Sequence, residues 1–133
     1  MDEQPTTGVA VEARGVVRRF PPATTVLDGI DVAVVPGEWV AVMGPSGCGK
    51  STLLQLLAGL DRPDAGQVWL GGERIDDRGE SARALVRRRA VGYVFQFQNL
   101  VPHLDVRANV ELPLRLAGLS GRQARERATE VLE

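Results

Sequence analysis

One stretch of nine residues constrains the fold of this chain more than any other. Residues 44–52 read Gly-Pro-Ser-Gly-Cys-Gly-Lys-Ser-Thr, which fits the phosphate-binding pattern G-x-x-x-x-G-K-[S/T]. Strand-forming residues at 38–43 precede the loop, and an apolar run at 53–58 follows it. Because a strand, a glycine-rich turn and a helix are the context in which this pattern binds phosphate, the sequence predicts an anion site here.

The residue types in the loop explain the predicted chemistry. Glycines let the backbone approach an anion, and the N–H groups of the turn and of the following helix attract negative charge. We expect Lys50 to reach the β- and γ-phosphates of a nucleotide and the Ser51 hydroxyl to ligate Mg²⁺. The alternative is a structural turn with a solvated lysine. The predicted contact residues are Gly44, Pro45, Ser46, Gly47, Cys48, Gly49, Lys50, Ser51 and Thr52.

Cys48 is the only cysteine, so the sequence predicts no internal disulfide and fits a reducing compartment. Its place near a helix N-terminus favours a reactive thiolate. The alternative, which we prefer, is a small residue that fills space in the loop. His103 is the only histidine, so no cluster of histidines can bind a metal within this sequence.

The composition is that of one ordinary globular domain, with 133 residues of which 44% are hydrophobic and 25% charged. The net charge is −1, so no broad positive field indicates a nucleic-acid partner. No apolar run approaches the ~18 residues that span a bilayer. We therefore expect any role at a membrane to depend on a partner protein.

Turn residues and apolar periodicity divide the chain further. We expect a tail at 1–8, and strands at 9–20, 26–35, 38–43, 67–70 and 91–95. Helices are expected after the loop and at 81–89, 105–117 and 122–133, with Ser81 as an N-cap and Pro113 as a kink or break. The predicted fold class is α/β, with a small antiparallel β part beside a P-loop core. Arg83, Arg87, Arg88 and Arg89 are interpreted as a solvated helix face.

Five motifs are considered together, namely Arg18-Arg19-Phe20, Leu27 to Glu38, the loop itself, Ala58 to Val68, and Val91-Gly92-Tyr93-Val94-Phe95-Gln96. As a set, they resemble the ATP-binding subunit of ABC transporters. Asn99 to Pro102 and Asn109 to Leu114 look like the lipoprotein-release and macrolide-export branch. The resemblance covers residues 9–133, and as a set these motifs are more specific than the loop alone.

The resemblance gives two further residues a role. It implies that Phe20 stacks on adenine, and that Gln96 contacts Mg²⁺ and the attacking water and senses the membrane subunit. Phe20 as a core aromatic and Gln96 as an edge residue bonded to backbone are the structural alternatives. The position of Gln96 at the carboxyl end of a predicted strand favours the ligand role.

The resemblance also implies an activity. It implies ATP binding, and hydrolysis in the intact subunit, to energise a membrane permease at the cytoplasmic face of the cell membrane. The intact subunit is expected to act as a homodimer that sandwiches two ATP molecules. The resemblance implies that the signature motif, the acidic metal-binding strand and the catalytic glutamate lie after Glu133. The P-loop core within residues 9–133 is therefore expected to be incomplete. This chain alone is therefore expected to bind Mg-ATP weakly at best and to hydrolyse it negligibly.

Two alternatives for the function remain open. Asp76-Asp77-Arg78-Gly79 fits the D-x-x-G pattern of P-loop GTPases, although no N-K-x-D motif is present. The second alternative is that the chain is a non-catalytic fragment that docks on a permease. Leu119-Ser120-Gly121-Arg122-Gln123 looks like the family signature, but Arg122 stands where the signature has its second glycine. We therefore predict a capping box between Ser120 and Gln123 instead.

Overall fold

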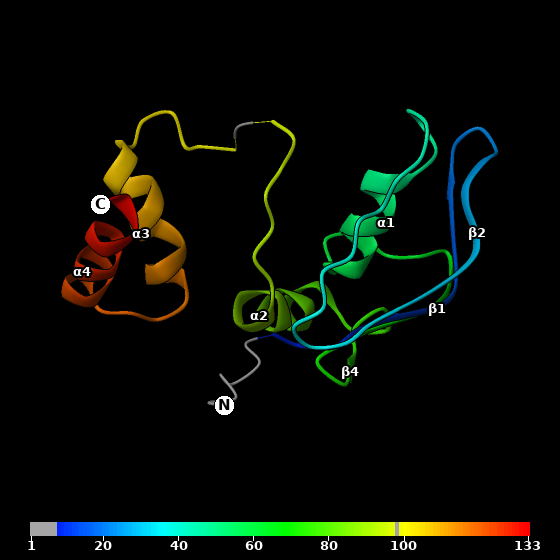
Figure 1. The fold of residues 1–133 in the computed structure, drawn as a ribbon, viewed down its shortest axis with the longest axis horizontal. Helices are drawn as coiled ribbons and strands as arrows, with labels where there is room; N and C mark the ends of the chain where they lie inside the picture. The colour runs from blue at the N-terminus through cyan, green and yellow to red at the C-terminus, as the bar shows by residue number, and fades with distance from the viewer. Residues whose placement is uncertain (1–7, 98) are drawn as a thin grey trace. The chain divides into compact units, whose positions relative to one another are not determined.

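The computed structural model describes residues 8–97 and 99–133. These residues divide into two compact units, the first ending at Gly92 and the second beginning at Tyr93 (Figure 1). Each unit is described by itself below. Except for Gly8, the predicted tail at 1–8 lies outside the described residues.

A four-stranded antiparallel sheet forms the base of the first unit. Its strands are β1 (Val11–Phe20), β2 (Thr24–Val34), β3 (Ala65–Leu70) and β4 (Glu73–Arg74), in the order β2-β1-β3-β4. The central strand β1 changes register against both neighbours close to Gly15. A glycine suits this position because its φ of 56° is one that other residues rarely adopt. The structure thus confirms the predicted α/β class with its antiparallel part.

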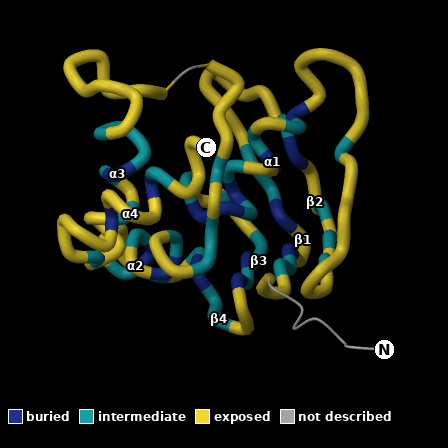
Figure 2. The backbone as a smooth tube through the Cα atoms, turned by 60° about the vertical axis from the view of Figure 1, so that its left-hand side comes forward, coloured by how far each residue is buried: buried dark blue, intermediate teal, exposed yellow. Residues whose placement is uncertain are grey.

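Two helices complete the first unit, α1 (Lys50–Leu57) and α2 (Glu80–Ala90). The core contains apolar side chains from the sheet and from both helices, and Figure 2 shows these buried segments. Its members are Ala13, Val16, Leu27, Leu53, Leu56, Val68, Leu70, Ile75 and Val86. Leu53 and Leu56 lie on one face of α1, so the core fixes the helix that starts at the glycine-rich loop.

Two arginines of α2 contradict the predicted solvated face. Arg83 is only 7% exposed, and its Nη1 donates to the carbonyl oxygen of Asp61 at 3.1 Å. Arg87 Nη1 donates to the carbonyl oxygen of Gly59 at 2.7 Å, and both guanidinium groups pair with Glu80. Hydrogen bonds from Arg87 and then Arg83 lower the pKa of Glu80. These arginines satisfy backbone carbonyls that follow the C-terminus of α1, where positive charge is favourable.

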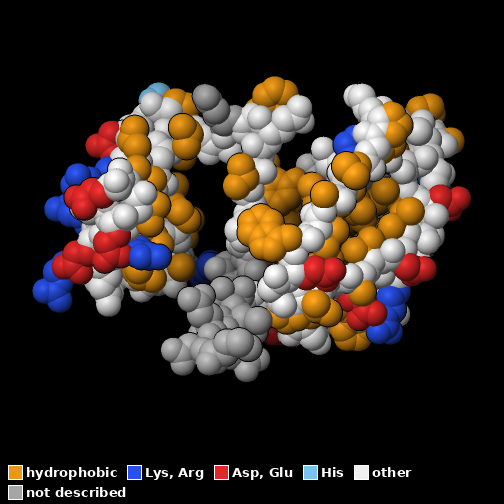
Figure 3. Space-filling model, in the orientation of Figure 1, with side chains coloured by type: hydrophobic (Ala, Val, Ile, Leu, Met, Phe, Trp, Pro, Cys, Tyr) orange, Lys and Arg blue, Asp and Glu red, His pale blue; other side chains and the backbone are white. Residues whose placement is uncertain are grey.

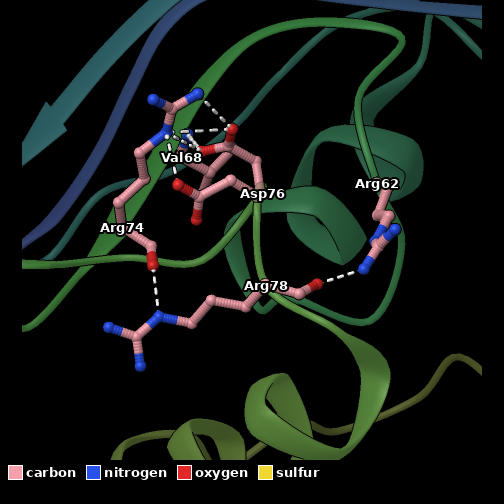
Figure 4. Close-up of polar contacts among 6 residues, drawn as sticks. Arg62, Val68, Arg74, Asp76 and Arg78 are labelled. Carbon is pink, nitrogen blue, oxygen red and sulfur yellow. Dashed lines mark hydrogen bonds and ion pairs between the residues drawn. The ribbon is translucent and has the colours of Figure 1, made fainter.

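The turn after β4 is held by the carboxylate of Asp76 (Figure 4). Asp76 accepts a hydrogen bond from the Val68 N–H at 2.7 Å and pairs with Arg74 Nη2 at 2.8 Å. Arg78 Nε donates to the Arg74 carbonyl oxygen at 2.7 Å, and the Arg78 carbonyl accepts from Arg62. Burial raises the pKa of Asp76, but the Arg74 pair and the Val68 N–H outweigh it and lower the pKa overall. The Asp76 carboxylate therefore stabilises the fold in its charged form.

Replacing the Asp76 carboxylate should make the free energy of unfolding depend less on pH in the acid range. The pKa of Asp76 is lower in the folded state, so its contribution is present above the unfolded-state pKa and is lost as the pH falls through the folded-state pKa. We expect Asp76→Asn to reduce the free energy of unfolding by about 1–2 kcal/mol at pH 7, because Arg74 loses its buried partner. Urea unfolding at pH 7 and pH 3 measures this loss, which should shrink at pH 3.

Asp77→Asn is the matched control for this measurement. Asp77 is more exposed than Asp76, and its carboxylate lies 3.7 Å from Arg74 Nε. An exposed pair of this kind contributes little to stability. Equal losses for the two variants, or a loss at Asp76 that is the same at both pH values, would contradict the role assigned to Asp76.

Two predicted strands are not strands in the described residues. Residues 38–43 and 91–95 have no assigned secondary structure, and neither stretch pairs with a strand there. Trp39, Met43 and Val94 are 99%, 88% and 96% exposed, and large apolar side chains are visible on the surface in Figure 3. The prediction was wrong because a strand needs hydrogen-bonded neighbours, which local sequence does not supply.

The second unit contains two helices, α3 (Val106–Leu116) and α4 (Gly121–Leu132), which pack against each other. Ala124 and Ala128 of α4 are buried, whereas Val131 and Leu132 at its end are exposed. Glu111 is buried and pairs with Arg115 Nη2 at 2.8 Å. The buried face of α4 thus contains two small residues, Ala124 and Ala128.

The helix ends test three local predictions. Ser120 and Gln123 form the predicted capping box, in which the Gln123 N–H donates to Ser120 Oγ at 3.4 Å and Gln123 Oε1 accepts from the Ser120 N–H at 3.0 Å. Ser81 is not an N-cap, because α2 begins one residue earlier, after Gly79. Helix α3 continues through Pro113, so no break occurs there.

Among the described residues, no helix combines the length and apolar character needed to cross a bilayer.

Candidate functional site

The glycine-rich loop lies in the first unit and leads directly into α1. Gly47 and Gly49 have φ values of 80° and 97°, so the backbone turns through the left-handed region twice before the helix begins. No side chain caps the start of α1, and its first turn contains no acidic residue. The first N–H groups of α1 therefore have no side-chain acceptor and face no nearby negative charge on their own helix. This is the arrangement that binds anions at helix N-termini.

Two glycines of the loop leave no room for a side chain. A Cβ on Gly49 would lie 2.8 Å from Val26 Cγ1 and 3.0 Å from the Val26 carbonyl oxygen. A Cβ on Gly44 would lie 2.7 Å from Cys48 Sγ. The start of α1 is thus packed directly on strand β2, and the loop is closed on itself. The packing of Gly49 on Val26 therefore fixes where the start of α1 sits in the first unit.

Lys50 bends back across the loop. Its Nζ donates to the carbonyl oxygens of Gly44 at 2.8 Å and Pro45 at 2.7 Å, and it lies 3.7 Å from Cys48 Sγ. Three contacts match the three donors of an ammonium group. The positive charge is therefore held at the loop itself, beside the N-terminus of α1, rather than extended into solvent.

The remaining loop residues are accessible. Pro45, Ser46, Cys48 and Ser51 are exposed, and Thr52 is half-buried. Within the described ranges, no group of three or more His, Cys, Asp or Glu side chains could hold a metal ion. A Mg²⁺ ion here would fit only as part of a nucleotide complex, since Mg²⁺ commonly takes few protein ligands together with phosphate oxygens and water. The exposed Ser51 hydroxyl in the first turn of α1 suits that role.

Phe20 is the last residue of β1 and pairs with Thr24 of β2. Its side chain is 39% exposed, so it is not a core aromatic. The guanidinium carbon of Arg18 lies over the ring, 4.9 Å from its centroid. The structure leaves this aromatic surface accessible at the end of the central strand. Its predicted contact with adenine remains a prediction.

Sequence reasoning missed the residues that hold Arg18. Its Nη2 lies 2.8 Å from Asp61 Oδ2 and its Nη1 lies 3.3 Å from Asp64 Oδ1. Asp64 Oδ2 also accepts a hydrogen bond from the Arg19 N–H at 2.6 Å. The signal available in the sequence was two aspartates within a proline- and glycine-containing turn, which is where carboxylates often bond to nearby backbone.

Gln96 lies in the second unit, and it is exposed. The stretch before it contains Tyr93 and Phe95, whose rings pack edge to face with centroids 4.6 Å apart. The proximity of Gln96 to the loop residues remains a prediction. Its contact with Mg²⁺ and with the attacking water also remains a prediction.

The D-x-x-G motif of the GTPase alternative has a structural role here. Asp76, its first residue, bonds to the Val68 N–H and to Arg74 within its own hairpin. A carboxylate engaged in this way is not directed at a nucleotide. The hairpin contacts therefore favour the ABC interpretation over a GTPase.

Comparison with known families matches residues 27–133 to the family described as ABC transporter. The lipoprotein-releasing system ATP-binding protein LolD of Pseudomonas syringae pv. tomato is 49% identical over 113 residues, which are 85% of this chain and 50% of that protein. An uncharacterized ABC transporter ATP-binding protein of Thermotoga maritima is 47% identical over 107 residues, 80% of this chain and 46% of that protein. The chain spans about half the length of the curated relatives it matches.

A solved structure leads to the same family. The dimeric post-hydrolysis structure of the ATP-binding cassette MJ0796, bound to ADP and phosphate, has a TM-score of 0.84 and 35% identity. The match covers 90% of this chain and 54% of that one. The predicted resemblance, including the lipoprotein-release branch, is confirmed by these relatives. Because the family match covers most of the sequence, this chain belongs to the ABC transporter family.

Proposed function

We propose that the loop at residues 44–52 binds the phosphates of Mg-ATP, and that the protein energises an ABC transporter. The observation that carries this proposal is the position of Lys50. Its ammonium group bonds back to the carbonyls of Gly44 and Pro45 at the start of the loop, beside a helix N-terminus with no side-chain cap. Positive charge and free N–H groups thus meet at one place, as phosphate binding requires.

Each loop residue has a defined task in this proposal. Lys50 exchanges its loop carbonyls for β- and γ-phosphate oxygens, which are stronger acceptors because they are charged. The N–H groups of the turn and of α1 bind the remaining phosphate oxygens. Ser51 would supply a hydroxyl ligand to Mg²⁺, and the ion would neutralise phosphate charge when bound. Phe20 offers a ring on which adenine stacks, and Gln96 positions water and Mg²⁺.

The wider role is proposed from the relatives. MJ0796 forms a dimer in its solved structures, and LolD is named for a lipoprotein-releasing system. We propose that the intact subunit dimerises, docks on a membrane permease and works at the cytoplasmic face of the membrane. A fragment that only docks on a permease would not need a lysine held at the loop, which favours nucleotide binding over that alternative.

Cys48 provides a direct test of the site. It is the only cysteine in the sequence, it is exposed, and it lies within the loop 3.7 Å from Lys50 Nζ. Bound phosphate should cover it, so Mg-ATP is expected to slow labelling of the chain by a maleimide several-fold. The measurement is the rate of mass gain by electrospray mass spectrometry, with and without Mg-ATP.

AMP is the matched control, since it has the same base and sugar but lacks the β- and γ-phosphates. Mg-tripolyphosphate should protect Cys48 and AMP should not. Equal labelling rates with and without saturating Mg-ATP would contradict the proposal. If AMP protected Cys48 as strongly as ATP does, the protection would not depend on the β- and γ-phosphates, and their proposed contact with Lys50 would be contradicted.

A further inference from the structure

We propose that Arg18 is a positioning residue that holds the Phe20 ring as a platform for the base of the nucleotide. The inference rests on the proposed function and extends it to a residue outside the loop. The Arg18 guanidinium lies over one face of the ring, 4.9 Å from its centroid, and the Phe20 side chain is 39% exposed. One face of the ring is thus occupied by a cation, so a base that stacks on Phe20 would use the other face.

Arg18 is itself held by two carboxylates. Its two terminal nitrogens pair with Asp61 at 2.8 Å and Asp64 at 3.3 Å, and its side chain is mostly buried. Asp64 is anchored to β1 a second time, because its N–H donates to the Val17 carbonyl at 2.8 Å. A guanidinium fixed at both ends of its fork cannot rotate freely. The ring that packs against it is restrained as well.

The same residue connects the ring to the phosphate loop. In the register of the sheet, Arg18 of β1 lies opposite Leu27 of β2. Leu27 Cδ2 would be 3.0 Å from a Cβ on Gly49, the residue at the N-terminus of α1. The two aspartates that hold Arg18 follow the other end of the same helix. Arg18 is therefore held by residues that follow the C-terminus of α1, and its partner in the sheet, Leu27, lies beside the residue that starts α1.

This arrangement predicts a specific loss when Arg18 is changed. Restraining the ring before binding removes an entropy cost that stacking otherwise carries, which corresponds to about a two- to tenfold effect on affinity. Arg18→Gln should therefore weaken Mg-ATP binding by that factor while binding of Mg-tripolyphosphate, which has no base, stays unchanged. Arg18→Lys keeps the cation but loses the fork, so it should restore part of the difference.

The experiment is calorimetric titration of the full chain with Mg-ATP and with Mg-tripolyphosphate. The quantity compared is the ratio of the two affinities, which a general loss of folding would not change selectively. Arg14→Gln is the matched control, because Arg14 is on the same strand and its guanidinium lies over a different ring, that of Trp69, at 5.9 Å. Phe20→Ala should reduce the ratio at least as far as Arg18→Gln does.

The outcomes separate this inference from the function it rests on. An unchanged ratio in Arg18→Gln, together with a lowered ratio in Phe20→Ala, would overturn the role of Arg18 alone. Equal affinities of the wild type for ATP and tripolyphosphate would overturn the base platform but leave the phosphate site intact. Binding of neither ligand would overturn the proposed function, and the role of Arg18 with it.

Discussion

Replacing Lys50 with methionine is expected to reduce Mg-ATP affinity by about 100-fold or more, because charge-assisted hydrogen bonds to two phosphate groups are lost. The substitution keeps the length of the side chain but removes the charge. In the unliganded loop the lost contacts are those to the Gly44 and Pro45 carbonyls, which are exposed and can bond to water. The fold should therefore persist, and calorimetric titration with Mg-ATP measures the loss of binding.

The specificity of this effect can be checked in two ways. Far-ultraviolet circular dichroism should show the same secondary structure in both proteins. Arg62→Gln is a control of equal charge change in the first unit, at a residue that bonds to the Arg78 carbonyl rather than to the loop. If Lys50→Met and Arg62→Gln lowered the affinity equally, general electrostatics rather than the loop would explain binding.

Replacing Gly66 with alanine is expected to destabilise the first unit by about 2–5 kcal/mol, through backbone strain and overpacking. Gly66 follows the first residue of β3 and has a φ of 89°. A Cβ there would lie 2.4 Å from the Gly15 carbonyl oxygen and 2.7 Å from that of Arg14. Both atoms belong to the backbone of the central strand, so they cannot move aside as a side chain would. Urea unfolding followed by circular dichroism measures the loss.

Gly72 serves as the control that distinguishes backbone strain from overpacking. It has a similar φ of 79°, but no atom lies within 4 Å of the place where its Cβ would stand. Gly72→Ala should therefore show only the backbone strain, about 1–2 kcal/mol. A loss at Gly66 no larger than the loss at Gly72 would show that β1 and β3 can separate at little cost, contrary to the close approach seen in the structure.

Features set by neighbouring residues were predictable from the sequence. The capping box of Ser120 and Gln123 depends on positions three apart in one helix, and it forms as predicted. The turn through Gly47 and Gly49 into α1 follows from the loop motif in the same way. Such features need no information about distant parts of the chain.

Features set by distant residues were not predictable. Residues 38–43 have the composition of a strand, yet pairing depends on neighbours from elsewhere in the chain. Arg83 is on a helix with many charged residues, and its burial depends partly on the carbonyl of Asp61, which the fold brings close from another part of the chain. The contact of Arg18 with Phe20 was likewise missed, because its restraint depends on aspartates more than forty residues away.

The unpaired stretch at residues 38–43 has a consequence for the affinity of the loop. The exit from the loop is packed into the core through α1, whereas among the described residues no strand pairs with the entry, which contacts the core through Val42. Conformational freedom that remains at the entry is lost when a ligand fixes the loop, and ordering one residue costs about 1–2 kcal/mol. Weak binding of Mg-ATP by this chain would therefore reflect the entropy of ordering the entry rather than a defect in the phosphate contacts themselves.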